Sequence, residues 1–279
     1  MTEIVETPVQ TDVLTDTQTD TQTAAGNVSK KNSVPGVSGA VLKMAAIVTM
    51  LIDHIGAVFC EQLVDIKITL AEYELPLGTV IYDLLRGIGR IAFPIFVFFL
   101  VEGFCRTRNR KKYALRLLLF SLISEVPFDL AFFGEVFYPK YQNVGFELLL
   151  AFLMMWVLDV IRKAPWEGTP GIVLKVALSV PTVAAFALLG KAGYVDYSYG
   201  GIVLAAFFYY HFHNENRKRW LAPLAGIVWC PFFEFSAIYG TSLCFLYNGK
   251  KGRQQKWFFY VFYPLHLTLL ALIHYAAVH

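Results

Sequence analysis

The stretch AVLKMAAIVTMLIDHIGAVFCE, residues 40–61, decides the fold class because it is apolar over a length that crosses a bilayer. At 1.5 Å per residue, a helix of this length covers the roughly 30 Å of hydrocarbon in a membrane. It nevertheless carries Asp53 and His54 side by side, with His54 roughly 20 Å deep if the helix enters near Val41. A charge there costs at least a few kcal/mol, so such residues normally face a protein interior or a wet cavity.

Composition places the whole chain in the membrane class. Of 279 residues, 56% are hydrophobic and only 16% are charged, and the mean hydropathy is +0.52. The net charge of +3 comes from short basic runs between apolar segments, so no nucleic-acid footprint is expected. We predict an all-α, polytopic membrane helix bundle of about nine transmembrane helices. The expected spans lie near 40–61, 79–105, 112–131, 143–162, 170–190, 199–213, 218–231, 233–248 and 257–277.

Lysine and arginine predict the orientation. Nine spans with a cytoplasmic N-terminus put these connectors inside: SKKNS, RTRNRKK, RKAPWEGTP, HNENRKR and GKKGRQQK. The outer connectors then carry only Lys67, Lys140 and Lys191, as the positive-inside bias requires. Residues 219–249 are either one long kinked helix or a tight pair around Pro231. The pair is favoured, because one helix would place GKKGRQQK outside.

The first 38 residues differ from the rest. They are polar, rich in Thr, Asp and Gln, and lack the apolar core of a signal peptide, so we expect a disordered cytoplasmic tail. Residues 39–279 form the integral membrane domain. The four cysteines have no CxxC or metal-ligand spacing, so neither a disulfide framework nor a zinc or other metal site is expected.

Other expected spans also carry polar residues at depth. Asp83, Arg86 and Arg90 fall at helical spacing on one face of the second span. Arg90 must find an anion, which is either Asp53 or the anionic group of a bound substrate. His266 reaches mid-bilayer in the last span. Further buried polar candidates are Glu102, Glu125 and Asp129.

Each of these residues also has a purely structural interpretation. A single Asp–Arg pair can fix helix register, and His266 after a proline can bond a freed backbone carbonyl. Two histidines, an arginine and an aspartate at depth on three spans instead favour a reaction site or a transport path. Lys43 supports this, because it precedes His54 by eleven residues on the same helix face.

Several longer motifs resemble one family. They are LKMAAIVTMLIDHIGAVF, LLRGIGRIAFPIFVFFLVEGF, TRNRKKYALRLLLFSLISEVPFDLAF, LLGKAGYVDYSYGGIVLAAFFYY, LYNGKKG and FFYVFYPLHLTLLAL. In this order they are similar to the TraX family, whose named member N-acetylates a conjugative pilin subunit. That family in turn resembles integral-membrane acyltransferases in which a first-span basic residue precedes the essential histidine by eleven. Lys43 and His54 match that pair, with Lys43 where those enzymes usually have Arg.

The resemblance implies a membrane acyltransferase-like domain that uses acetyl-CoA as co-substrate. His54 would be the general base, Asp53 would orient or balance nearby groups, and Arg90 would stabilise the anion. His266 would be a second acid/base or a substrate contact. The residues expected to hold the co-substrate are Lys43, Arg86, Arg106, Arg108, Lys112, Arg116, Lys250 and Arg253. The cytoplasmic cations among them are equally explained as topology signals alone.

Two functions therefore stay open. One is transfer of acetyl from cytoplasmic acetyl-CoA to an amine or hydroxyl of an envelope or pilin-type acceptor. The other is a transporter or flippase that uses the same charges as a relay, although the chain shows no internal repeat of the kind many transporters have. The expected location is the bacterial cytoplasmic (inner) membrane. Expected partners are membrane lipids and the acetyl acceptor, and a homodimer is left open.

Overall fold

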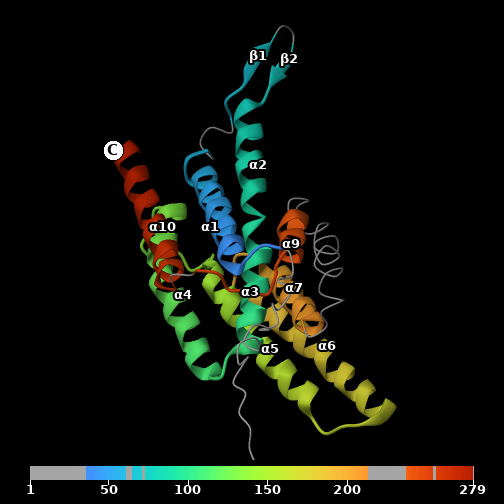
Figure 1. Ribbon diagram of the computed structural model, residues 1–279. Coiled ribbons are helices and arrows are strands. Elements are labelled where there is room, and N and C mark those ends of the chain that lie inside the picture. Colours follow the sequence, from blue (N-terminus) through green and yellow to red (C-terminus); the bar gives the residue numbers. More distant parts are fainter. Residues whose placement is uncertain (1–35, 61–64, 71–72, 213–236, 254–255, 279) are drawn as a thin grey trace, which may run out of the picture. The chain divides into compact units, whose positions relative to one another are not determined.

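The computed structural model describes residues 36–60, 65–70, 73–212, 237–253 and 256–278. This part is mainly helical, and its longer helices run in the order expected from the sequence (Figure 1). The expected tail, residues 1–38, lies outside it except for the last three residues. The helices are α1 (Gly39–Ile55), α2 (Leu77–Gly89), α3 (Ala92–Arg106), α4 (Arg110–Phe133), α5 (Val144–Lys163), α6 (Gly168–Ala192), α7 (Ser198–His211), α9 (Ala237–Phe245) and α10 (Lys256–Val278).

The first expected span is confirmed as a helix with one irregularity. Directly after α1, residues Gly56–Cys60 form a turn of π-helix, η1. Such turns are rare and occur mostly as single insertions, frequently at functional sites. Asp53 and His54 lie in the last turn of α1, immediately before η1, and both are buried. The irregular turn therefore sits beside the two residues that make the first span unusual.

The second expected span is two helices. α2 and α3 meet at Arg90 and Ile91, which interrupt an otherwise continuous apolar segment. Pro94 explains the break, because it has no N–H to bond the carbonyl of Arg90 four residues earlier. The break places the Arg90 side chain at a helix junction inside the membrane segment.

Helix α3 forms the centre of the core. It packs against α1, α5, α7 and α9, and most of its side chains are buried, including Phe93, Val97 and Phe104. Around it, α1 packs beside α2 and α10 packs beside α4, as Figure 1 shows. The last helix of the chain thus returns to the first half of the fold.

Five helical segments are long and apolar enough to cross a membrane: Gly39–Cys60, Leu77–Arg106, Val144–Lys163, Gly168–Ala192 and Trp257–Ala277. The chain is therefore a membrane protein with several spanning helices, and the expected count of nine is not confirmed. Three expected spans, at 112–131, 199–213 and 233–248, coincide at least in part with α4, α7 and α9. Helix α4 carries Glu125 and Asp129, whereas α7 and α9 have only 14 and 9 residues. The expected span 218–231 lies outside the described residues.

Helix α6 presents apolar side chains outward. Only 6% of its most apolar window is buried, and Ile172, Val176 and Leu188 are exposed. In water this surface would be unfavourable, since burial of apolar area stabilises by roughly 25 cal/mol per Å². Against lipid tails it costs nothing, which agrees with the packing of α6 on α5 and α7 as its neighbours among the described helices.

A short antiparallel hairpin departs from the all-α expectation. Strands β1 (Ile68–Leu70) and β2 (Tyr73–Leu75) pair with Ile68 opposite Leu75 and Leu70 opposite Tyr73. Two strands of three residues cannot form a core of their own. The hairpin precedes α2 in the chain and leaves the helical architecture unchanged (Figure 1).

The basic LYNGKKG segment caps the N-terminus of α1. The backbone N–H groups of Gly39 and Ala40 donate to the carbonyls of Lys250 and Lys251, each at 2.9 Å. These N–H groups have no partner inside their own helix, so the segment satisfies donors that would otherwise be left open. Gly252 adopts φ +70° against Ser38, where an added Cβ would lie 2.7 Å from the Ser38 hydroxyl. Lys251 is thereby brought close to the first turns of α1.

Two glycines allow α1 and α2 to approach closely. A Cβ on Gly56 would lie 2.7 Å from Cβ of Leu85, and a Cβ on Gly89 would overlap the Asp53 side chain. Small residues are the usual means of close helix packing in membranes. The ion pair that Asp53 makes with α2 therefore depends on the missing side chain at Gly89.

We expect Gly89→Ala to lower the free energy of unfolding by about 1–3 kcal/mol, because the added methyl group must displace Asp53 or separate α1 from α2. Thermal unfolding in detergent measures this. Ala184→Val, which adds atoms to an exposed position on α6, is the control and should leave the transition temperature unchanged. Equal stability of the two variants would contradict the packing described.

Candidate functional site

The structure brings the two deep histidines together. Nδ1 of His54 on α1 lies 2.7 Å from Nε2 of His266 on α10, and the rings are parallel with centroids 5.0 Å apart. Both side chains are buried. The 212 residues between them along the chain make this a tertiary contact that no local pattern contains.

The hydrogen bonds determine where the protons of this pair lie. Nδ1 of His266 is 2.8 Å from the carbonyl of Phe262, which can only accept, so this nitrogen carries a proton and donates. In neutral His266, Nε2 must then accept from Nδ1–H of His54. Neutral His54 consequently has its lone pair on Nε2. The pair can take up a proton at Nε2 of His54. His266 meanwhile orients the His54 ring and accepts a hydrogen bond from the resulting imidazolium.

The structural interpretation of His266 is confirmed in part, and its role in a reaction stays a prediction. It does bond a backbone carbonyl, four residues earlier on its own helix, and it also contacts the other buried histidine. The carbonyl freed by Pro264 would be that of Tyr260, so the bond to Phe262 is not a repair of the proline site.

A cavity of about 460 Å³ approaches the histidine pair from one side. Its inner end includes Met50, one turn before His54 on α1, and Tyr263, whose ring centroid lies 6.0 Å from that of His54. Phe262, also in the wall, stacks on His266 at 4.8 Å. The middle of the wall is apolar and comes from α1, α3, α4, α5 and α10. Its other apolar and aromatic residues include Ile47, Phe96, Phe99, Leu100, Leu117, Phe120, Leu148 and Phe259.

The other end of this cavity is basic. Among the described residues, Lys43, Arg106, Arg116 and Lys251 line it together with one carboxylate, Glu102, which leaves a charge of +3. The Lys43 ammonium lies 4.6 Å from the centre of the Phe99 ring. As the sequence predicts, Lys43 and His54 lie on one stripe of α1, and the structure shows that the stripe follows the cavity wall through Ile47 and Met50.

Glu102 is structural in this arrangement. Its Oε1 accepts from the Tyr247 hydroxyl at 2.7 Å and lies 3.0 Å from Nη2 of Arg106. The contact from Tyr247 ties α3 to the segment after α9. Glu102 therefore positions Arg106 at the basic end of the cavity.

Asp53 pairs with Arg86. The distance from Asp53 Oδ2 to Arg86 Nη1 is 2.9 Å, and the Asp53 side chain is almost fully buried. The sequence offered Asp53 or the anionic group of a bound substrate as the partner of Arg90, and took Arg86 as a co-substrate contact. The structure places Arg86 on Asp53 and outside the cavity wall, and the charge of Asp53 also acts on Arg90.

Arg90 belongs to a second polar group, formed by the loop between α6 and α7. Its guanidinium lies 5.5 Å from the centre of the Tyr197 ring and interacts with the charge of Asp196. The Tyr141 hydroxyl donates to Asp196 Oδ1 at 3.0 Å. Burial raises the pKa of the Asp196 carboxyl, whereas the charge of Arg90 opposes that rise. Arg90 thus links Asp53, next to His54, to the polar loop between α6 and α7.

The remaining buried carboxylates of α4 and α5 hold chain segments in place. Glu125 accepts from the side chain and backbone of Asn143, and Asp129 accepts from the Tyr138 N–H at 2.8 Å. Glu147 accepts from the Tyr197 N–H at 2.6 Å, at the start of α7. These contacts explain Glu125 and Asp129 without a catalytic role.

The other predicted co-substrate residues lie outside this cavity. Arg108 lines a separate hollow, Lys112 donates its backbone N–H to Asn109 at the start of α4, and Lys250 contributes a carbonyl to α1. Arg253 is exposed. Of the eight predicted residues, Lys43, Arg106 and Arg116 are those that the structure brings to one cavity wall.

Comparison with known proteins identifies the family of the chain. A family model described as TraX protein matches residues 38–274, nearly the whole described part of the chain. The chain belongs to the TraX family. A probable fimbrial assembly protein FimC, serogroup H1, from Dichelobacter nodosus is 28% identical over 255 residues, which cover 82% of this chain and 92% of that protein. No solved structure matches the chain.

In this TraX protein the sequence did not single out several residues of the site. Asp196, Tyr197 and Tyr141 surround Arg90, and Tyr263 contacts His54. The polar run VDYSYGG between two apolar spans was a usable signal, since it places Asp196 directly before a helix. Lys251 was missed because its neighbours Lys250 and Arg253 are chemically equivalent in sequence.

We expect the Asp53–Arg86 pair to show strong energetic coupling. Arg86→Gln leaves a buried carboxylate short of a partner and should cost about 3 kcal/mol of stability. The double variant Asp53→Asn/Arg86→Gln should lose less free energy of unfolding than the two single variants lose together, by about 1–3 kcal/mol. Chemical denaturation of the four proteins measures the coupling. Asp83→Asn, on the exposed face of α2, is the control, and additive losses would contradict the pairing.

Proposed function

We propose that this TraX protein is an integral membrane acetyltransferase that takes acetyl from acetyl-CoA and transfers it to an amine or hydroxyl of an envelope or pilin-type acceptor. The observation that carries the proposal is the single cavity with a basic end and an inner end bounded by residues in contact with the histidine pair. Such a cavity suits a co-substrate with phosphates at one end and a reactive thioester at the other.

The dimensions support this assignment. Lys43 and His54 are eleven residues apart on α1, about 16 Å at helical rise, which the extended pantetheine arm of CoA can follow. The cavity volume of about 460 Å³ lies in the range of small-molecule sites. The net charge of +3 at its basic end favours phosphate groups there. The nucleotide would then lie at the membrane boundary and the arm inside.

The proposed reaction needs one base and one positive group. The acceptor N–H or O–H attacks the thioester carbonyl, and Nε2 of His54 takes its proton. The C–S bond breaks, CoA leaves as thiolate, and the imidazolium returns the proton to sulfur. His266 keeps the proton of His54 on Nδ1 and thereby leaves Nε2 basic. Arg90, at the break between α2 and α3, supplies positive charge next to the pair, and Asp53 holds α2 in place.

We further propose that the acceptor enters from the side opposite the cavity. Arg90, Asp196 and Tyr141 form the polar group there, and an adjacent hollow of about 700 Å³ is lined by Tyr141, Tyr194 and Asp196. In this hollow Tyr194 adopts φ 52° and Ser198 φ 55°, which side-chain-bearing residues adopt at a cost that commonly marks functional loops. The name of the fimbrial assembly relative supports a pilin-type acceptor.

The proposal includes an orientation. The basic end of the cavity faces the cytoplasm, where acetyl-CoA is made, and the polar loop before α7 faces the outside of the cytoplasmic (inner) membrane. Nine spans with a cytoplasmic N-terminus agree with the distribution of Lys and Arg. The basic residues Arg106 and Lys251 at the cavity then lie on the same side as the N-terminal tail.

A transporter or flippase is the second candidate. The specific observation in its favour is that the Arg90 charge acts on His54, on Asp53 and on Asp196, which lines the hollow of about 700 Å³, while a separate cavity reaches the histidine pair through Tyr263 and Phe262. Acetyl transfer predicts CoA release at a rate equal to acceptor acetylation. A transporter predicts acceptor movement across a vesicle membrane without CoA release, so one assay in vesicles with labelled acetyl-CoA distinguishes the two.

We expect His54→Ala to lower the rate of acetyl transfer by about 100- to 10,000-fold, since a general base typically contributes that much. Binding of CoA and thermal stability should change little. His211→Ala is a matched control, because His211 also bonds the carbonyl four residues earlier, that of Phe207, at 2.7 Å. Transfer by His54→Ala at the wild-type rate would refute the catalytic role.

We expect Lys43→Gln and Arg106→Gln each to weaken CoA binding by about tenfold, the loss of one charge-assisted contact to phosphate. Lys43→Arg should retain most of the affinity. Lys140→Gln, an exposed cation in a different connector, is the control. Isothermal titration in detergent measures these constants, and an unchanged affinity in both variants would place the phosphates elsewhere.

A further inference from the structure

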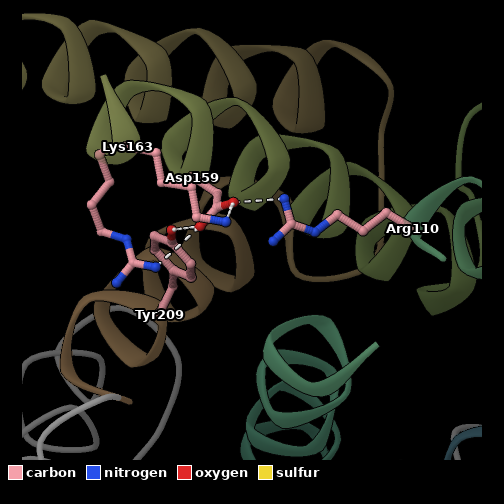
Figure 2. Close-up of polar contacts among 5 residues, drawn as sticks. Arg110, Asp159, Lys163 and Tyr209 are labelled. Carbon is pink, nitrogen blue, oxygen red and sulfur yellow. Dashed lines mark hydrogen bonds and ion pairs between the residues drawn. The ribbon is translucent and has the colours of Figure 1, made fainter. Parts of the chain in front are cut away.

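A second basic cluster lies outside the proposed reaction site. The Asp159 side chain on α5 is only 3% exposed and gathers three cations. Its Oδ2 lies 2.6 Å from Arg110 Nη1 and 2.8 Å from Lys163 Nζ, and its Oδ1 lies 3.1 Å from Arg162 Nη2. Tyr209 of α7 donates its hydroxyl to Oδ1 at 3.1 Å. Figure 2 shows Arg110 reaching Asp159 from α4, with Tyr209 on the other side.

This cluster has more positive charge than its carboxylate needs. A carboxylate offers about four acceptor positions, and four donors occupy them here. Among the described residues, three cations against one anion leave a charge of +2. A single arginine would neutralise Asp159, so the other cations, besides signalling topology, are available for a further anion. The side chains of Arg162 and Lys163 are 39% and 64% exposed and can reach a ligand outside the protein.

The cluster is held in one geometry at a membrane boundary. It lies where α4 begins and α5 ends. The Arg110 guanidinium packs over the Phe104 ring at 4.2 Å, and that of Arg162 lies 5.6 Å from the Tyr209 ring centre. These contacts fix the cations before any ligand arrives, which lowers the entropy that binding must offset.

The surroundings have the features of a lipid site. A hollow of about 430 Å³ next to the cluster is lined by Thr107, Arg108, Asn109, Arg110, Lys111 and Trp156. Tryptophan and basic residues together are typical of the headgroup level of a bilayer. Further along α4 and α5, Leu115, Leu119, Val157 and Val160 expose apolar side chains. Basic sites with apolar surface below them bind anionic lipid headgroups in membrane proteins.

We propose that the cluster around Asp159 binds the phosphodiester headgroup of an anionic phospholipid, with the acyl chains along the exposed faces of α4 and α5. Arg162 and Lys163 contact the phosphate, and Arg110 joins the two helices that the lipid bridges. The lipid thereby stabilises the contact of α4 with α5 and α7. This inference does not depend on acetyl transfer.

Lipid binding to the purified, full-length protein tests the proposal. We would compare phosphatidylglycerol with phosphatidylcholine by native mass spectrometry and by thermal shift in mixed micelles. Inorganic phosphate and CoA are added in separate measurements as soluble competitors. Wild type should prefer phosphatidylglycerol. In the double variant Arg162→Gln/Lys163→Gln that preference should fall by about 25-fold, since each of the two cations near an anionic headgroup contributes about fivefold. It should still fold, because Arg110 remains on Asp159.

The matched control removes two exposed cations elsewhere, Lys140→Gln/Lys191→Gln, and should keep the wild-type preference. Equal binding of both lipids to wild type would overturn the proposal, as would a double variant with unchanged preference. Displacement of the lipid by phosphate or CoA would identify a soluble phosphate site instead. If the double variant does not fold, the single variant Lys163→Gln is measured in its place. A wild-type preference of this variant for phosphatidylglycerol would overturn the inference.

Discussion

A bilayer interior offers no water to a buried carboxylate, and the contacts between helices in this protein follow from that constraint. Asp53 ties α1 to α2 through Arg86, and Glu102 ties α3 to the segment after α9 through Tyr247. Glu147 holds the start of α7, and Asp159 joins α4, α5 and α7. Each carboxylate is costly alone and stabilising only with its partner, so the polar contacts specify which helices are neighbours.

The helix break at Arg90 also determines which charged groups become neighbours. Pro94 interrupts the long second segment, and the interruption places an arginine where its charge acts on His54. Gly89 then lets Asp53 approach, so a charged pair from α1 and α2 lies beside His54. A continuous helix with a larger residue at this position would separate α1 from α2 and leave Asp53 without its nearest cation.

The two basic regions differ in what surrounds them. Around the cavity, cations line a concave space whose wall reaches residues in contact with the histidines, and Glu102 offsets only part of their charge. Around Asp159, the cations cover a buried anion and point to the surface. A concave site suits a co-substrate that must be held for reaction, whereas an exposed cluster suits a headgroup from the surrounding lipid. Both regions look alike in the sequence, as basic runs beside apolar spans.

The sequence by itself determined the membrane class, the positions of most helices and the stripe from Lys43 to His54, because these depend on hydropathy and helical periodicity within one segment. It also indicated that His54, His266, Asp53 and Arg90 share an unusual depth. Only the tertiary structure decided that His54 meets His266, that Arg86 pairs with Asp53, and that Asp159 collects three cations. The physical reason is that depth and face follow from local spacing, whereas the partner of a buried charge depends on which helices pack together.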